Sequence, residues 1–303
     1  MDFVVVDVET ANADLSSICQ IGIASFQSDS LADAWVSLVN PGAPFSSTNI
    51  SIHGIYPRDV ESAPTWPEIY PHVADRLQGM VVVSHTPFDR VALERACLRA
   101  NMQDCDCMWL DSAAVVRRAW PEFSQSGYGL ANVARCFGID YQAHDALEDA
   151  RCAGLILLRA IEHTGIRAEE WLRYAGHHRS SQSGSLGHSH TGWKSYPGPV
   201  KREGNPDGKL AGEVVVFTGE LTVSRSEAAK VASMAGCQVD DGVTKRTTLL
   251  VVGDQDIERL AGHDKSSKER KAELLINKGH MIQILTESDF QHLLAWAAKA
   301  DNN

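Results

Sequence analysis

Two carboxylates near the N-terminus lie where a buried strand would normally hold only apolar side chains. Residues 3–10 read FVVVDVET, a β-branched run that predicts a strand. Asp7 and Glu9 are two positions apart, so both side chains project from the same face of that strand. Two like charges side by side at the end of a buried strand are costly unless other groups compensate them. The sequence therefore predicts that another group near the end of this strand compensates the two negative charges.

Three further residues are candidates for the same site. Asp89 follows the strand-like run MVVVSH, near the start of a helix. Asp149 lies in a helix that begins near Asp145, beside apolar neighbours, where a carboxylate is unusual. His144 lies on the loop that enters this helix. Asp145 and Glu148 have the D-x-x-E spacing of a capping box, so we assign them to the helix start and not to the site.

Together these residues form the donor set of a two-cation site with a general base. Hard carboxylate oxygens of this kind select Mg²⁺ or Mn²⁺. Two divalent ions would neutralise the negative charges of Asp7 and Glu9, which the strand itself does not compensate. Ions ~4 Å apart stabilise both the attacking and the leaving oxygen of a phosphodiester. Histidine, with an ordinary pKa near ~6.5, is suited to take a proton from the attacking water. His144 is our candidate for that role.

The segment before residue 176 predicts an α/β fold. Strand-like runs occupy residues 3–10, 18–26, 34–39 and 80–85, and helix-like runs occupy residues 87–100, 128–139 and 145–161. Three consecutive strands predict an antiparallel meander, and the later strand–helix–strand pattern predicts parallel additions. We therefore expect a mixed sheet flanked by helices.

Charge and composition exclude several classes of function and location for this sequence. Residues 1–175 hold 23 acidic and 12 basic residues, all twelve of them arginine, so this segment is not a general polyanion binder. Nucleic acid would have to bind locally, through cations or a few arginines. No apolar run is long enough to span a membrane, and the N-terminus lacks a secretory signal. Seven cysteines without framework spacing favour reduced thiols and a cytoplasmic location.

The motifs DVET, SHTPFD and HDALEDA resemble the three exonuclease motifs of the DEDDh family, which includes the proofreading ε subunit of bacterial DNA polymerase III. The resemblance covers roughly residues 1–165 and implies an RNase H-like fold and 3′-to-5′ removal of nucleotides. It also implies that Asp7, Glu9, Asp89 and Asp149 are metal ligands and that His144 is the general base. Thr86 departs from the asparagine common at its position in the family.

A second unit follows a segment without hydrophobic period. Residues 176–208 are rich in Ser, Gly, His and Pro, which predicts a flexible linker between a domain at 1–175 and another at 209–303. Residues 209–303 alternate strands and helices, as a small parallel α/β domain would.

The texts FTGELT, SRSEA and TKRTTLLVVG in this second unit resemble a BRCT domain of the kind found in NAD⁺-dependent DNA ligases. Within that resemblance, Thr218, Gly219, Arg225 and Lys268 match a phosphate-binding pocket. A hydroxyl, a backbone N–H and two cations near helix N-termini suit an oxyanion. Ordinary surface and turn roles for these four residues remain the alternative.

The sequence thus predicts a cytoplasmic, metal-dependent 3′-to-5′ DNA exonuclease, tethered to a module that docks to DNA ends or to replication and repair proteins such as a polymerase. 5′-phosphorylated ends are one candidate ligand of the module. An exonuclease that trims RNA 3′ ends is the alternative within enzymes. A non-catalytic DNA-binding adaptor is the alternative of another class, and the intact set of five site residues argues against it.

Overall fold

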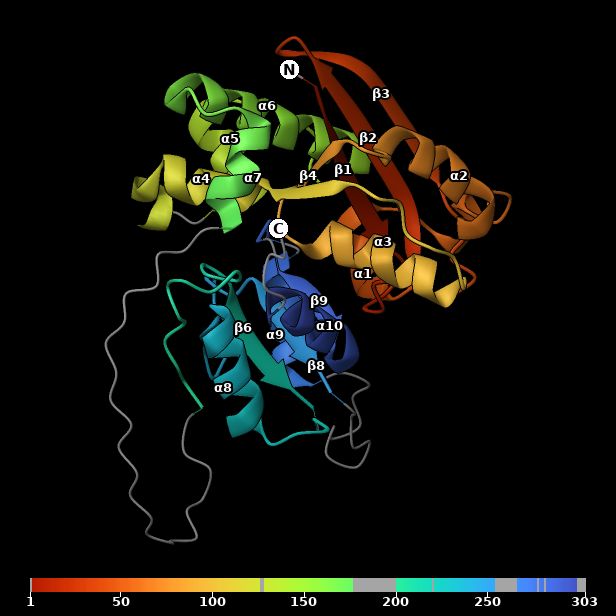
Figure 1. Ribbon diagram of the computed structural model, residues 1–303. Helices are drawn as coiled ribbons and strands as arrows, with labels where there is room; N and C mark the ends of the chain where they lie inside the picture. The colour runs from red at the N-terminus through yellow and green to blue at the C-terminus, as the bar shows by residue number, and fades with distance from the viewer. Residues whose placement is uncertain are drawn as a thin grey trace, which may run out of the picture.

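The chain folds into two α/β units, one above the other in the view of Figure 1. This computed structural model describes residues 2–125, 128–176, 200–219, 221–253, 266–276, 278–280 and 282–298. Each unit is built on its own sheet, one of five strands and one of four. No helix in these described stretches is long and apolar enough to cross a membrane.

The first unit has a five-stranded mixed sheet in the order β3-β2-β1-β4-β5. Its strands are β1 (Phe3–Thr10), β2 (Ile18–Gln27), β3 (Ser30–Leu38), β4 (Val81–Ser84) and β5 (Met108–Asp111). The first three pair antiparallel, whereas β4 pairs parallel with β1 and β5 pairs parallel with β4. The expected meander with parallel additions is therefore confirmed.

Helices cover both faces of this sheet, and alternate residues of β1 face different helices. The helices are α1 (Ser47–His53), α2 (Trp66–Leu77), α3 (Phe88–Arg99), α4 (Ser112–Ala119), α5 (Leu130–Phe137), α6 (Ala146–Thr164) and α7 (Ala168–Gly176). Val4 and Val6 pack in one core with side chains of α2 and α3, while Phe3 and Val5 pack in the other with side chains of α4 to α7. Since the period of a strand is two, Asp7 and Glu9 continue the row of Phe3 and Val5 toward α6.

The start of α6 lies unusually close to the sheet because β2 has a glycine beneath it. A Cβ atom on Gly22 would come within 2.4 Å of backbone atoms of Ala146 and Leu147. Gly22 also pairs with Asp7 across the β1–β2 ladder. The missing side chain thus lets the first turn of α6 approach the carboxylate end of β1.

The second unit has a four-stranded, all-parallel sheet in the order β7-β6-β8-β9. Its elements are β6 (Val214–Thr218), α8 (Arg225–Ala235), β7 (Gln238–Val239), β8 (Leu249–Val252), α9 (Ser267–Ile276), β9 (Gln283–Thr286) and α10 (Glu287–Ala298). The parallel α/β fold expected for this unit is confirmed.

The domain boundaries at residues 175 and 208 stay a prediction. Of the expected linker, residues 177–199 lie outside the described residues. Residues 200–208 contact the second unit: Arg202 and Val239 exchange two backbone hydrogen bonds, and the Asn205 N–H donates to the carbonyl of Ser233 at 2.7 Å.

Candidate active site and metal centre

The site forms where the end of β1 meets the first turns of α6 and α3. Asp7 and Glu9 are partly buried on β1, and Asp149 of α6 and Asp89 of α3 are 4% and 3% exposed. The Val8 N–H donates to Asp89 Oδ1 at 3.0 Å, which fixes α3 against β1. The four carboxylates predicted from the sequence therefore come from three elements that converge at the carboxyl end of the central strand β1.

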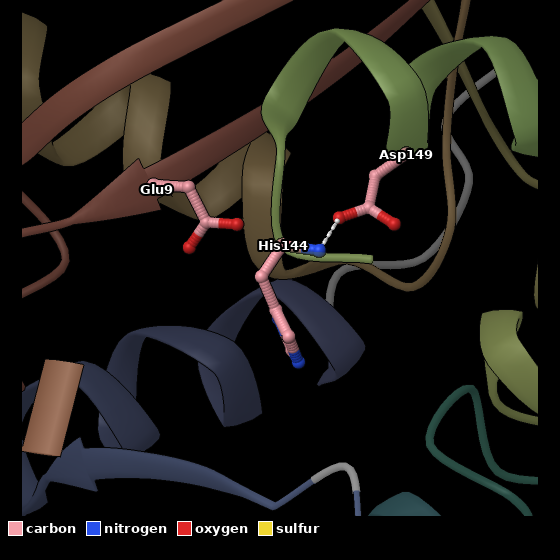
Figure 2. Close-up of side chains that lie close together, drawn as sticks. All are labelled: Glu9, His144 and Asp149. Carbon is pink, nitrogen blue, oxygen red and sulfur yellow. Dashed lines mark hydrogen bonds between the residues drawn. The ribbon is translucent and has the colours of Figure 1, made fainter. Parts of the chain in front are cut away.

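Glu9, His144 and Asp149 make up the one group of potential metal ligands found in the described part of the chain, with ligand atoms within 4.8 Å of one another. Figure 2 shows Glu9 and Asp149 with the loop that carries His144. The backbone N–H of His144 donates to Asp149 Oδ2 at 2.8 Å. Asp7 and Asp89 are not part of this compact group, but they act on it through their charge.

Burial and mutual repulsion raise the pKa of every carboxylate in this cluster. Burial raises the pKa of Asp7 and of Glu9 well above the usual range, and repulsion from Asp89 and Asp149 adds to the effect in both. Burial likewise raises the pKa of Asp89 to about 8 and that of Asp149 to about 7, although backbone N–H donors oppose the shift. The protein alone does not stabilise four negative charges here.

The capping assignment of Asp145 is confirmed. Asp145 is the N-cap of α6, and its Oδ1 accepts from the N–H groups of Leu147 and Glu148, each at 3.1 Å. Its charge still reaches the site, because repulsion from Asp145 contributes to the raised pKa of Asp7, Glu9 and Asp149.

The donor set fits hard divalent cations. Carboxylate oxygens are the ligands that Mg²⁺ and Mn²⁺ prefer, and cations would stabilise the ionised forms that burial disfavours. Asp149 Oδ1 is buried and has no partner within hydrogen-bond geometry among the described residues, although the Tyr141 hydroxyl is near enough to Asp149 to lower its pKa. This oxygen therefore has room for a ligand. Glu9, Asp149, Asp7 and Asp89 are thus the residues that would hold the metal.

His144 lies in a left-handed backbone conformation, with φ 66°, immediately before the cap. Histidine is among the residues that tolerate this region. The turn aims the His144 N–H at Asp149 and leaves the imidazole free of that hydrogen bond. Burial lowers the pKa of His144, so the ring is neutral near pH 7 and able to accept a proton.

A second histidine, His53 at the end of α1, lies near the site and was not singled out from the sequence. Its Nδ1 accepts from the Ile55 N–H at 3.0 Å, so its Nε2 carries the proton and donates to the Thr10 carbonyl at 3.2 Å. Burial, together with repulsion from the nearby His144, lowers the pKa of His53 to about 4, although the hydrogen bond to Thr10 opposes the shift. The signal was the HGI text between the first two motifs.

Thr86 occupies a strained position in the second motif. Its φ is 88°, which is uncommon for any residue with a side chain and most so for a β-branched one. Asparagine tolerates this conformation, which gives a physical reason for the family preference noted above. Here the Thr86 N–H donates to Asp111 Oδ1 at 3.1 Å, and the Thr86 carbonyl accepts from the Ser84 hydroxyl at 2.7 Å.

In the second unit, the structure brings the four predicted pocket residues together at the end of β6. Arg225 and Lys268 both donate to the Phe217 carbonyl at 2.8 Å, and Arg225 also donates to the Gly219 carbonyl. The Thr218 hydroxyl lies 2.8 Å from that of Ser266. Burial and the nearby Arg225 lower the pKa of Lys268. Two cations therefore meet at one strand end.

Both units match known families. Residues 4–157 match the exonuclease family (RNase_T), and residues 205–294 match the BRCA1 C-terminus (BRCT) domain. Because the first match spans just over half of the chain, the protein belongs to the exonuclease family, and it carries a C-terminal BRCT domain. The resemblances to DEDDh exonucleases and to BRCT domains are thereby confirmed.

Curated relatives match each unit separately. Over 178 residues the chain is 24% identical to the PolC-type DNA polymerase III of Pediococcus pentosaceus, and over 57 residues it is 46% identical to the DNA ligase of Gluconobacter oxydans. These matches cover 56% and 18% of the chain but only 12% and 8% of the relatives. Each match therefore involves one of the two units and spans only a small part of the relative's length.

Two solved structures resemble the first unit. Exonuclease X in complex with 5′-overhanging duplex DNA is 20% identical, with a TM-score of 0.47 and coverage of 56% of this chain and 98% of that one. The nuclease domain of 3′hExo, a DEDDh family member bound to rAMP, is 18% identical, with a TM-score of 0.48 and coverage of 54% and 92%.

The raised carboxylate pKa values predict that the metal-free protein loses stability as pH rises. Above the unfolded pKa near ~4, the folded state keeps protons that the unfolded chain has released, so the free energy of unfolding falls up to the folded pKa of about 8 at Asp89. The lowered pKa of His53 acts in the opposite direction below pH ~6.5. The clean window is therefore pH 7 to 8.

In EDTA, we expect the melting temperature to fall between pH 7 and 8 and this fall to shrink in Asp89→Asn, whose amide oxygen can still accept from Val8. Adding Mg²⁺ should raise the melting temperature more at pH 8 than at pH 5.5. Glu162→Gln is the control, because Glu162 is an exposed carboxylate in the last turn of α6 that pairs with Arg159. A melting temperature that is flat from pH 7 to 8 in EDTA would contradict the prediction.

Proposed function

We propose that the protein is a two-metal-ion 3′-to-5′ exonuclease that hydrolyses DNA from its 3′ end. The observation that carries this proposal is the convergence of Glu9, Asp149 and His144 within 4.8 Å, surrounded by the charges of Asp7 and Asp89. Membership of the exonuclease family supports the reaction class. The two units separately match a DNA polymerase and DNA ligases, which favours DNA over RNA.

In the proposed reaction each residue has a distinct task. Divalent cations, Mg²⁺ or Mn²⁺, would supply the positive charge that the attacked phosphate and its leaving oxygen require. Neutral His144 would accept the proton of the attacking water, the role that its lowered pKa allows. Asp149 holds the loop of His144 through the backbone N–H, and Asp89 holds α3 to β1.

For the C-terminal unit we propose docking to 5′-phosphorylated DNA ends, with replication or repair proteins as the alternative partners. Arg225 and Lys268 meet at one strand end, which favours an anion. The domain limits 1–175, 176–208 and 209–303 and a cytoplasmic location belong to the same proposal. All seven cysteines are described and free, as reduced thiols would be.

The direct test of the nuclease is digestion of end-labelled DNA and RNA oligomers. We expect Mg²⁺- or Mn²⁺-dependent release of mononucleotides from the 3′ end of DNA, so that a 5′ label yields a shrinking ladder. Asp7→Ala should nearly abolish digestion while the protein stays folded, and Glu162→Gln, at an exposed carboxylate paired with Arg159, should leave it unchanged. Full activity in EDTA or in Asp7→Ala would sink the metal proposal, and activity on RNA alone would favour the exoribonuclease.

The base assignment predicts a separate phenotype for His144. His144→Ala should lower turnover by roughly 10²–10⁴-fold because proton removal from water is lost. Metal affinity should change much less, since this proposal does not make the ring a ligand. Isothermal titration with Mn²⁺ checks this point, and a collapse of affinity would reassign His144 as a metal ligand.

The BRCT pocket predicts a preference among DNA ends. Full-length Asp7→Ala, which should bind without cutting, is expected to bind a duplex with a 5′ phosphate more tightly than the same duplex with a 5′ hydroxyl. A terminal phosphate carries more charge than an internal one, so the preference should weaken with salt. Adding Arg225→Ala and Lys268→Ala should erase it, at ~1.5–3 kcal/mol per lost charged hydrogen bond. Equal anisotropy titrations for both duplexes would leave protein docking as the better role.

A further inference from the structure

The carboxylate of Asp289 in the BRCT domain is buried against the exonuclease domain. Asp289 is 0% exposed. Its Oδ2 accepts from the Leu15 N–H at 3.1 Å, and its Oδ1 accepts from Arg95 Nε at 3.0 Å. Both donors belong to the nuclease: Leu15 lies in the loop that leaves β1, and Arg95 lies on α3. In Figure 1, α10 lies directly below α3 and α1.

These contacts with the nuclease take the place of hydrogen bonds that would otherwise cap the N-terminus of α10 within the BRCT domain. Thr286 and Asp289 have the spacing of a capping box at the start of α10. One half is present, since the Asp289 N–H donates to Thr286 Oγ1 at 3.2 Å. The other half is redirected only in part: the Thr286 N–H donates to the carbonyl of the nuclease residue Ala13, and the Asp289 carboxylate reaches Leu15 and Arg95. Within its own domain, Asp289 Oδ2 still accepts from the Thr286 hydroxyl at 2.7 Å.

The neighbouring helix α9 shows what an undiverted box looks like in this domain. There Glu269 accepts from the Ser266 N–H at 2.9 Å, and Ser266 Oγ accepts from the Glu269 N–H at 3.2 Å. The α10 box differs because its carboxylate accepts from donors of the other domain. Of the three donors found for this buried carboxylate among the described residues, the two from the nuclease are lost if the domains separate.

Other contacts extend the same interface on both sides of Asp289. His292, one turn later on α10, lies 3.1 Å from Arg95. The guanidinium of Arg90, on α3 of the nuclease, lies 5.9 Å from the ring centre of Trp296 on α10. On the opposite side, Thr48 of α1 donates to Glu273 of α9.

The two nuclease elements that Asp289 joins also carry catalytic carboxylates. The loop of Leu15 begins directly after Glu9 and Thr10, and α3 carries Asp89 in its first turn. Arg99 of α3 additionally donates to Ser16 in this loop at 3.3 Å. Metal sites and catalytic groups lose efficiency when their supporting elements shift by about an ångström.

We propose that the BRCT domain is a fixed structural part of the exonuclease and that Asp289 is a positioning residue for its active site. By accepting from Leu15 and Arg95 at once, Asp289 holds the loop after Glu9 against the helix of Asp89. This inference rests on the proposed exonuclease function for its catalytic consequence, but not for the docking itself.

The test uses four full-length variants. Asp289→Ala removes the acceptor, and Arg95→Gln removes a donor without touching α10. The double variant asks whether the two act through one interaction, in which case it should be no worse than the stronger single variant. Ser288→Ala is the matched control, because Ser288 is exposed on the same turn and bonds only to the Thr286 hydroxyl among the contacts observed.

The first readout is amide hydrogen exchange, which needs no activity. We expect exchange of segments 11–17 and 90–99 to rise at least tenfold in Asp289→Ala and in Arg95→Gln, with 214–218 still protected because the BRCT core remains folded. The second readout is digestion of a tetranucleotide with a 3′ label, a substrate too short to need BRCT docking to DNA. We expect kcat to fall about tenfold in both variants, KM to change little, and Ser288→Ala to match the parent.

The possible outcomes distinguish three claims: the docking of the two domains, the positioning role of Asp289 and the exonuclease function. Unchanged exchange in Arg95→Gln would overturn the docked arrangement. Raised exchange with unchanged kcat would overturn the positioning role. If the parent chain digests no oligomer at all, the proposed function fails, while the exchange result still decides the docking.

Discussion

Repulsion among the carboxylates at the end of β1 is the constraint on which the nuclease domain is built. Because side chains alternate between the two faces of β1, Asp7 and Glu9 both point toward α6, which carries Asp149. Backbone donors compensate part of the charge, through Val8 to Asp89 and His144 to Asp149. Burial and repulsion nevertheless outweigh these bonds, since the pKa values of all four groups are raised. The fold therefore gathers four carboxylates whose negative charge divalent cations would stabilise.

Backbone geometry gives this charged site its shape. Gly22 lets the first turn of α6 approach the sheet, and the left-handed turn at His144 directs its N–H toward Asp149. Thr86 holds the second motif in a similarly uncommon conformation and ties it to Asp111. Strained residues of this kind persist where surrounding contacts over-determine them, which is typical of functional sites.

The BRCT domain meets the nuclease through groups that neither domain satisfies alone. A buried carboxylate such as Asp289 is tolerated only with its donors in place, and two of those donors come from the nuclease. The arrangement differs from a module held only by a tether, for which local concentration would be the sole coupling. Because the BRCT domain docks next to the loop that follows Glu9, the two domains are coupled by direct packing and hydrogen bonds.

The sequence by itself determined the class of fold and the positions of most strands and helices, and it predicted the site residues. It did not locate β5, α4 or α7. Period-two and helical patterns are local, and the three motifs each lie within a few residues, so no tertiary information was needed. It missed His53, because nothing local shows that the end of α1 approaches His144. No local pattern singled out Asp289. Only the tertiary structure decided that the four carboxylates lie close enough to repel one another. It also decided that Arg225 and Lys268 donate to the same carbonyl, and that Asp289 accepts a hydrogen bond from the other domain. The reason is physical: partners 80 to 280 residues apart, such as Val8 with Asp89 and Leu15 with Asp289, are selected by packing and by the satisfaction of buried groups, and these leave no local pattern.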